Sequence, residues 1–417
     1  MKRKLQAAFI FLVVIFSLRF FDAHFISEEI INYGSYLLFL MVLGLSVPHM
    51  LSERGGLILP VQLVFAGILL SMPMAYLAWG QGIKDTIIIT LPYLMWVLFF
   101  FLLRVSFPVK LLEKIVLTYG VIYIVLYFFQ LSQSPTVLFG SSMWGDEFIE
   151  SRGIVRIIFP GAGIFILAVF IAVNKLTTQR KDRMFWVFMV AMGVLIPVLQ
   201  VTRQFVIGIS MIFLYHFLKG QNFFKKSGTV VAFIIVVLFV FNTDTKVITG
   251  LIEAAQRDIE LGSDYIRVKA AEYFLTDFSP NLLTRLLGNG APMWGLSAYG
   301  IYVARLAVYE GLYQSDVGII GMYSMFGILP VIGYIIIWVK SFTVELPEEY
   351  QYVRYYFWYL LLTSFTWYTV YHYHYIMSTV FALYIFHVIS QRVVEFERED
   401  GSRVKLFFSQ EAEVESR

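Results

Sequence analysis

Long apolar runs recur along almost the whole sequence and constrain its fold more than any other feature. A helix needs about 20 apolar residues to cross the hydrocarbon core of a bilayer. The runs predict twelve membrane-spanning helices, at about 5–21, 30–50, 57–79, 86–103, 113–131, 154–173, 184–200, 201–218, 228–242, 315–339, 352–370 and 374–390. Because only a short polar stretch around Val201 separates the seventh span from the eighth, counts of eleven and thirteen stay open.

Composition agrees with an all-α polytopic membrane protein. Of the 417 residues, 59% are hydrophobic and 15% are charged, too few charges to cover a water-facing surface. Soluble enzyme classes are therefore excluded. The net charge of +3 is small, so no nucleic-acid partner is expected and the expected surroundings are a lipid bilayer. Without cysteine, the chain has no disulfides, thiolate metal sites or cysteine nucleophiles.

Basic residues predict the orientation of the spans. With a cytoplasmic N-terminus, 21 of the 32 Lys and Arg residues fall in inside segments, and six of the other eleven lie in one long outer loop. This bias follows the positive-inside rule and places both termini in the cytoplasm. The basic start at Met1–Lys4 precedes an apolar run without a small-residue cleavage site, so the first helix is expected to be uncleaved. We predict one membrane domain over 1–390 and a cytoplasmic tail over 391–417.

Two outer loops are long enough to fold, at about 132–153 and 243–314. The second loop joins the ninth and tenth spans. Between Leu251 and Phe278 its apolar and charged residues interleave, which predicts one or two amphipathic helices broken near Gly262. The segments 279–281 and 287–292 are rich in Gly, Pro, Ser and Asn, which is typical of turns.

Arginines on the predicted outer side are the sharpest candidate site residues. Arg203 lies on the turn between two tight spans, where it is either a ligand contact or an interfacial side chain that snorkels to the surface. Arg152 and Arg156 are four residues apart and share one helical face, as ligand contacts or anchors. The long loop adds three more arginines, which either bind a ligand or pair with loop carboxylates: Arg267, Arg285 and Arg305.

The sequence offers one principal acidic candidate. Asp316 begins the tenth span, where it is an N-cap, a catalytic base or both. Asp146 and Glu147 are reserve candidates for the base. His372 and His374 alternate with tyrosines on an outer turn, a pattern typical of an aromatic belt at the membrane interface. Because no outer carboxylates or histidines have metal-ligand spacing, we predict no metal and no other cofactor.

Guanidinium groups around an outer cavity indicate a phosphate-bearing ligand, since their paired N–H donors match phosphate oxygens. A lipid-linked pyrophosphate carrying a glycan fits this chemistry. Outer tyrosines and tryptophans suit sugar faces, and equally suit an interfacial belt. Four glycines of the tenth span are expected to allow close helix packing: Gly318, Gly321, Gly327 and Gly333.

Four local patterns occur in order along this layout. They are Arg152-Gly153 leading to Pro160-Gly161, Thr202-Arg203-Gln204, Gly262-Ser263 through Arg267 to Leu287-Gly288-Asn289-Gly290, and Ser315-Asp316-Val317-Gly318 through Gly327. With its many spans and one large late outer loop, the chain resembles the O-antigen polymerase and ligase family of bacterial envelope glycan assembly. Ligases of this family carry a His in the region that corresponds to residues 313–316. This chain has no His between His216 and His372, which favours a polymerase over a ligase.

The resemblance implies a GT-C-like architecture in the bacterial cytoplasmic (inner) membrane. It also implies a metal-independent glycosyltransferase that polymerises undecaprenyl-pyrophosphate-linked oligosaccharide repeat units of O-antigen, capsule or exopolysaccharide. A flippase and a chain-length regulator of the same pathway are its implied partners. On this basis we assign catalytic roles to Arg203, Arg267, Asp316 and Arg152, and substrate binding to Arg156, Arg285, Arg305, Tyr265 and Tyr313. The alternatives are an O-antigen ligase-type transferase and a lipid-linked oligosaccharide flippase.

Overall fold

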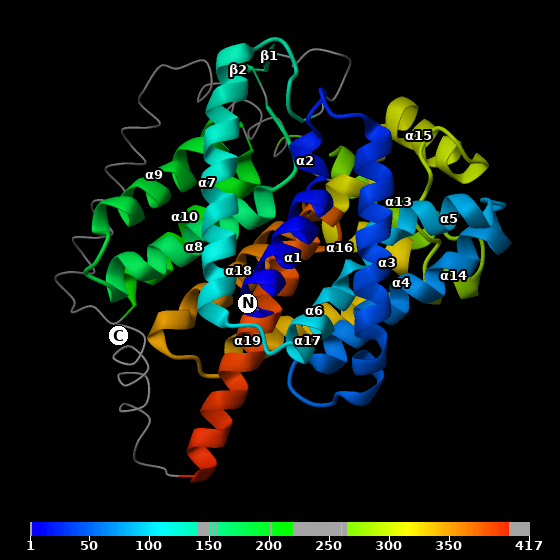
Figure 1. The fold of residues 1–417 in the computed structure, drawn as a ribbon. Helices are drawn as coiled ribbons and strands as arrows, with labels where there is room; N and C mark the ends of the chain where they lie inside the picture. The colour runs from blue at the N-terminus through cyan, green and yellow to red at the C-terminus, as the bar shows by residue number, and fades with distance from the viewer. Residues whose placement is uncertain are drawn as a thin grey trace.

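Helices dominate the computed structural model of the chain (Figure 1). The structure describes residues 2–140, 150–151, 154–155, 157–200, 202–219, 260 and 265–399. Two short strands, β1 (Glu150–Ser151) and β2 (Ile154–Val155), pair antiparallel with Glu150 opposite Val155. Five apolar helical stretches are long enough to cross a bilayer. The chain is therefore an all-α membrane protein, as its apolar runs predict.

Helices of the first 140 residues follow the predicted spans closely. They are α1 (Lys2–Ser17), α2 (Arg19–Asp22), α3 (Glu28–Ser52), α4 (Ile58–Trp79), α5 (Ile83–Thr90), the 3-10 helix η1 (Leu91–Val97), α6 (Leu98–Arg104) and α7 (Val109–Gln133). The side chain of Ser27 caps α3 by accepting a hydrogen bond from the N–H of Ile30. Gly80 ends α4 with a φ of 66°, a left-handed conformation that glycine adopts without strain.

The remaining helices include those in the described part of the long loop. They are α8 (Ala162–Thr178), α9 (Arg183–Leu199), α10 (Arg203–Leu218), α13 (Ile266–Thr276), α14 (Leu282–Leu287), α15 (Ala298–Glu310), η3 (Gln314–Val317), α16 (Gly318–Phe326), α17 (Ile328–Thr343), η4 (Glu348–Tyr350), α18 (Gln351–Thr363), η5 (Tyr368–Val370) and α19 (Tyr373–Glu399). The predicted ninth span, 228–242, lies outside the described residues, so the count of twelve stays a prediction.

Three predicted spans have different bounds in the structure. The sixth helix begins at Ala162 instead of 154, because Pro160 and Gly161, the latter with a φ of 108°, precede it. The tenth span is not one helix: α16 ends and α17 begins at Gly327, whose φ is 76°. The eleventh ends at Thr363, before the turn that contains η5. By contrast, α19 is longer than the predicted twelfth span and continues beyond residue 390 into the predicted tail.

The centre of the bundle is formed by α8. Its residues from Gly163 to Asn174 are all buried, and it packs against α7, α9, α18 and α19. In Figure 1 the helices α8, α9 and α10 lie on one side of the upright α7, whereas α4, α5 and the loop helices lie on the other. The bundle thus has two sides, with α7, α1 and α19 between them.

The long loop is packed into the bundle through two glycines. A Cβ on Gly288 would lie 2.4 Å from the carbonyl oxygen of Met325, and a Cβ on Gly327 would lie 2.4 Å from that of Leu286. Both residues have positive φ, so glycine fits their conformation as well as their close approach. The turn that ends α14 therefore packs directly against the break between α16 and α17.

Asn289 fixes this turn. Its side chain is fully buried, accepts a hydrogen bond from the indole N–H of Trp79 at 2.8 Å, and donates to Ser279 Oγ at 2.9 Å and to the Ser324 carbonyl at 2.8 Å. A buried amide with all these partners stabilises one arrangement of α4, α16 and the loop. The segment 288–292, for which the sequence predicts turns, is irregular backbone with positive φ at Gly288 and Gly290, and it holds the loop in place.

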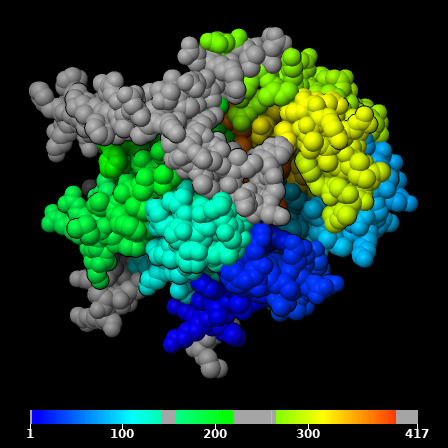
Figure 2. Space-filling view, turned by 90° about the horizontal axis from the view of Figure 1, so that it is seen from above, coloured from blue at the N-terminus to red at the C-terminus, as the bar shows by residue number. Residues whose placement is uncertain are grey.

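A second buried amide, that of Gln81, joins the loop to the end of α4. Gln81 donates to the carbonyl of Ala291 at 2.9 Å and accepts from the N–H of Met293 at 2.9 Å and the hydroxyl of Ser297 at 2.7 Å. Seen from above, the yellow loop segment lies directly beside the lighter blue segment that contains this residue (Figure 2). The described part of the loop is thus a folded unit.

Candidate active site

Arg267 and Asp316 form an ion pair between the long loop and the turn that precedes α16. The guanidinium Nε of Arg267 lies 3.6 Å from Asp316 Oδ2, and the two side chains are 23% and 30% exposed. The same guanidinium lies 5.9 Å from the centre of the Tyr265 ring. Three residues that the sequence predicts as site residues therefore meet in one place. Their partial exposure leaves donors and acceptors within reach of a ligand.

The backbone around Asp316 is fixed by buried contacts. Tyr371 donates its hydroxyl to the Gln314 carbonyl at 2.9 Å, and the N–H of Ile319 donates to the Ser364 carbonyl at 2.6 Å. Between them, Gly318 has a φ of 48°, and a Cβ there would lie 1.8 Å from the Ser364 oxygen. Asp316 is thus held by the segment that follows α18.

Asp316 is not the N-cap of the following helix. The N-cap of α16 is Val317, and no side-chain hydrogen bond caps that helix. The turn η3 inserts one 3-10 turn before the helix begins, which moves the carboxylate away from the first free backbone N–H groups. The N-cap role is therefore wrong, and the catalytic role of Asp316 stays a prediction.

The four glycines of the predicted tenth span do make close contacts. In addition to Gly318 and Gly327, a Cβ on Gly321 would lie 2.2 Å from the Gln314 carbonyl, and one on Gly333 would lie 2.8 Å from the Pro60 carbonyl. The prediction of close packing is confirmed. Gly321 also brings α16 against the turn that carries Asp316.

An aromatic segment, residues 364–375, runs from the end of α18 into the first turn of α19 and lies between the parts of the site. The ring of Tyr368 stacks on Trp367 at 4.6 Å and contacts His372 at 4.3 Å, and His372 stacks on Tyr373 at 4.4 Å. The rings of His372 and His374 contact each other edge to face at 4.3 Å, and both side chains are half-buried, so their assignment to an interfacial belt stays a prediction. Burial lowers the pKa of His372 to about 3, so its imidazole is neutral at physiological pH.

His374 and the turn before Arg203 line one small cavity. Its lining also contains Gln200, Thr202 and Trp367. Within the part of the chain that the structure describes, the Nε2 atom of His374 is buried and has no hydrogen-bond partner. Arg203 is half-buried and is the first residue of α10. Arg203 and Asp316 therefore belong to elements that flank the same aromatic segment.

The other loop candidates differ in how close they lie to the ion pair. Arg285 is exposed and donates a hydrogen bond to the carbonyl of Thr276, which ties α14 to the end of α13. Arg305 is exposed on α15. Tyr313 is half-buried, and its carbonyl accepts a hydrogen bond from the N–H of Asp316 at 3.1 Å. Tyr313 is therefore close to the site, and Arg285 has a local structural contact instead.

Several predicted residues fall outside the described part of the chain. These are Arg152, Arg156, Asp146 and Glu147, so their roles stay predictions. The helical face predicted for Arg152 and Arg156 is wrong, because residues 150–151 and 154–155 are strands and the helix begins at Ala162. Among the loop aromatics expected to contact sugars, Tyr299 is fully buried and stacks on Trp79 at 4.9 Å. Tyr302 stacks on the same indole at 5.2 Å. These two rings belong to the core between α4 and the loop, which is a different role from either one that the sequence suggested.

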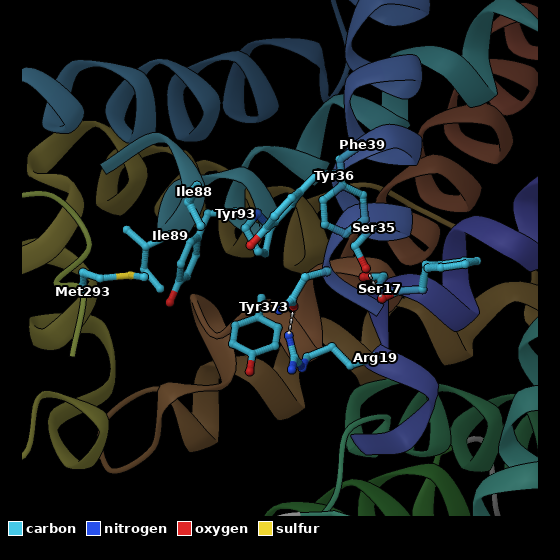
Figure 3. Close-up of a pocket in the computed structure, with 13 residues that line it drawn as sticks. Ser17, Arg19, Ser35, Tyr36, Phe39, Ile88, Ile89, Tyr93, Met293 and Tyr373 are labelled. Atoms are coloured by element: carbon cyan, nitrogen blue, oxygen red, sulfur yellow. Dashed lines mark hydrogen bonds between the residues drawn. The ribbon is translucent and has the colours of Figure 1, made fainter. Parts of the chain in front are cut away.

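Sequence reasoning missed Arg19, which lies at a second cavity shown in Figure 3. Arg19 donates from Nε to Asp22 at 3.0 Å and from Nη1 to Asn32 Oδ1 at 2.9 Å. Burial raises the pKa of the Asp22 carboxyl, and the charge of Arg19 opposes this shift. Its sequence signal was an Arg and an Asp three residues apart at the outer end of an apolar run.

The backbone that carries Arg19 is strained. Residues 19–22 all have φ between 50° and 59°, a left-handed conformation that costs roughly 1–2 kcal/mol for each residue other than glycine. Four such residues persist only when surrounding contacts over-determine them. The bond between Gly140 N–H and the Phe21 carbonyl, at 3.0 Å, is one of those contacts.

Comparison with known proteins adds no relative. No protein-family model matches the sequence, and no curated protein matches it at a significant level. The function therefore has to be argued from the site itself.

Proposed function

We propose that this protein is a glycosyltransferase that polymerises oligosaccharide repeat units carried on undecaprenyl pyrophosphate. The observation that carries the proposal is the meeting of Arg267, Asp316 and Tyr265 beside an aromatic segment whose other side faces the start of α10. A carboxylate, a guanidinium and aromatic rings at the end of a membrane bundle suit a lipid-linked, phosphate-bearing sugar. The resemblance in sequence layout supports the same reaction.

In the proposed reaction a sugar hydroxyl of one lipid-linked unit attacks the anomeric carbon of a chain carried on a second lipid. The new glycosidic C–O bond forms as the bond from that carbon to the pyrophosphate oxygen breaks. The hydroxyl proton passes to the Asp316 carboxylate, and undecaprenyl pyrophosphate leaves with the bonding electrons. We expect no metal to be required, because arginines supply the positive charge that the leaving group needs.

Direct displacement requires the base and the leaving group on opposite sides of the anomeric carbon. Arg267, 3.6 Å from Asp316, accordingly serves the acceptor side and orients the carboxylate. Arg203, at the start of α10, serves the pyrophosphate on the other side of the aromatic segment. Both arginines have catalytic roles in the sequence-based prediction, whereas the proposed reaction gives Arg267 to the acceptor and Arg203 to the leaving group.

The proposal includes a topology. Twelve spans in a GT-C-like arrangement, with both termini in the cytoplasm, would bring the loop helices and η3 to the outer face of the bacterial inner membrane. The pathway flippase and chain-length regulator would then be neighbours on that face. The cytoplasmic tail and the outer loops are part of this proposal.

One observation favours a ligase-type transferase as a second candidate. The sequence lacks a His near Asp316, but His372 directly follows Tyr371, whose hydroxyl binds the Gln314 carbonyl. A histidine thus follows directly on a residue that contacts the turn carrying Asp316, so the missing sequence motif argues less strongly against a ligase.

Transfer by purified protein tests the proposal and separates the two candidates. The protein in detergent receives a lipid-linked repeat unit as its sole substrate, with EDTA present. A ladder of longer glycans is expected, and Asp316→Asn should abolish it. Glycan transfer only after addition of a different lipid acceptor would favour the ligase, and the absence of transfer in both reactions would contradict both.

A further inference from the structure

A cavity of about 240 Å³ lies between α3, η1 and the start of α19, apart from the Arg267–Asp316 pair. Figure 3 shows its two ends. Arg19, Ser17 and Ser35 lie at one end, with the Tyr373 ring beside the Arg19 guanidinium, and Ile88, Ile89 and Met293 lie at the other. The cavity thus has a guanidinium and serine hydroxyls at one end, with Phe39, and aliphatic side chains at the other, with Tyr93.

The end of the cavity with Arg19 has donors for an anion. Arg19 uses Nε for Asp22 and one Nη1 hydrogen for Asn32, and a guanidinium has five N–H donors in total. Tyr36 and Tyr373 line the same cavity, and their hydroxyl groups are further donors. One cation with neighbouring neutral donors is typical of a phosphate site.

The charge of the lining favours an anion. Among the thirteen lining residues Arg19 is the only cation, and none is Asp or Glu. Asp22, which pairs with Arg19, does not line the cavity. A negatively charged group that enters the cavity therefore meets a guanidinium and no lining carboxylate.

The surroundings of the cavity are apolar. On α3, next to the lining residues Asn32 and Tyr36, Ile30 is 61% exposed and Leu37 is 63% exposed. On α5, Ile87 is 45% exposed beside the lining residues Ile88 and Ile89. In an all-α membrane protein such exposed apolar side chains are typical of contact with lipid chains. Exposed apolar side chains therefore flank the cavity on both α3 and α5, where an aliphatic chain would contact lipid instead of water.

We propose that this cavity binds the phosphate group of a membrane lipid, with Arg19, Tyr36 and Tyr373 as its ligands. The assignment of that lipid as a prenyl phosphate rests on the proposed function. A polymerase handles two lipid-linked chains at once, and this cavity is a second carrier site in addition to the one beside Arg203. The step is binding alone, with no covalent change.

Binding of farnesyl phosphate to the purified full-length protein in detergent, measured by isothermal titration calorimetry, tests the proposal. Farnesyl phosphate should bind at least tenfold more tightly than farnesol, which lacks the phosphate, or inorganic phosphate, which lacks the chain. Arg19→Gln should weaken binding by tenfold or more, because it removes a charge-assisted contact. Lys84→Gln is the matched control: it removes a cation of α5 that does not line the cavity, and binding should equal that of the wild type.

Arg19→Gln also leaves Asp22 without its partner and can impair folding, so Tyr36→Phe provides a second test. This variant removes one hydroxyl from a half-buried side chain, and we expect a two- to tenfold loss of affinity. Wild-type affinity in both variants would overturn the proposal, as would inorganic phosphate that binds as tightly as farnesyl phosphate. No glycan is present in this assay. A protein that binds farnesyl phosphate but makes no glycan ladder would contradict the proposed function alone, and an active polymerase that fails to bind it would contradict the cavity alone.

Discussion

The carboxylate of Asp316 lies 3.6 Å from the guanidinium of Arg267, and this contact joins α13 of the long loop to the turn that begins α16. Neither partner is deeply buried, so the pair itself contributes little to stability, of the order of 1 kcal/mol or less. The pair matters because of where it places its two charged groups. It brings the two principal charged groups of the proposed acceptor side within reach of one substrate.

The Arg267–Asp316 pair should act as a unit in transfer. We expect Asp316→Asn to lower the initial rate of glycan polymerisation by about 10² or more, because it removes the proposed base. If Arg267 acts by orienting that carboxylate, the Arg267→Gln, Asp316→Asn double variant should be no slower than Asp316→Asn alone. Asp277→Asn, an exposed carboxylate at the end of the same helix, is the control and should keep the wild-type rate. If the rate losses of the two single variants multiplied in the double variant, the two residues would act independently, and this prediction would be contradicted.

Arg203 should be sensitive even to lysine. Arg203→Ala removes both the charge and the paired donors, and we expect the rate to fall by about 10² or more. Arg203→Lys keeps the charge but loses the bidentate geometry, so it should also lose most polymer. Glycan ladders compared at equal membrane protein levels measure the effect, with exposed Arg183→Lys as the control. A wild-type ladder from Arg203→Lys would mean that Arg203 is an interfacial anchor.

Gly318→Ala should destabilise the protein and disturb the turn that carries Asp316. The φ of 48° alone costs a residue with a Cβ roughly 1–2 kcal/mol, and the Cβ would lie 1.8 Å from the Ser364 oxygen. The midpoint of thermal unfolding in detergent should therefore fall. Gly44→Ala provides the contrast, because a Cβ there meets nothing within 4 Å, and its midpoint should stay equal or rise. Equal midpoints in both variants would contradict the close approach at Gly318.

His372 should make stability depend on pH. Its pKa is about 3 in the folded protein and 6.5 in the unfolded chain, so between these values the unfolded chain binds more protons. The free energy of unfolding should fall as the pH drops below about 6.5, by at most about 1.4 kcal/mol per pH unit from this group. Unfolding midpoints at pH 7 and pH 4.5 measure the effect, which His372→Gln should reduce and His49→Gln should leave unchanged. A pH dependence in His372→Gln identical to that of the wild type would argue against the neutral, buried imidazole.

The proposed topology can be tested with two single cysteines in this cysteine-free chain. Tyr309 on α15 and Met184 at the start of α9 are each 82% exposed; Tyr309 belongs to the predicted outer loop, and Met184 is at the predicted cytoplasmic end of the seventh span. A membrane-impermeant thiol reagent added to intact cells should label Tyr309→Cys and spare Met184→Cys until the cells are lysed. The reverse pattern would overturn the orientation.

The sequence by itself determined the class of the protein and most of its helices. Whether a segment enters a bilayer depends on the summed hydropathy of about 20 neighbouring residues, a local quantity, so the apolar runs predicted α3, α4 and α7 within a few residues. Local patterns also singled out Arg267 and Asp316. They could not reveal the break at Gly327, because glycine is common inside membrane helices and only the backbone of the loop, packed against it, explains the break.

Tertiary structure alone decided which candidates meet. Arg267 and Asp316 are close because α13 packs against α16 and η3, whereas Arg285, in the same loop, turns to the carbonyl of Thr276. The buried amides of Asn289 and Gln81 hold the loop in this arrangement through partners distant in sequence. The cavity beside Arg19 likewise forms only because helices from both ends of the chain pack together. Such contacts depend on how whole helices pack, and hydropathy, which sums over neighbours along the chain, carries no information about them.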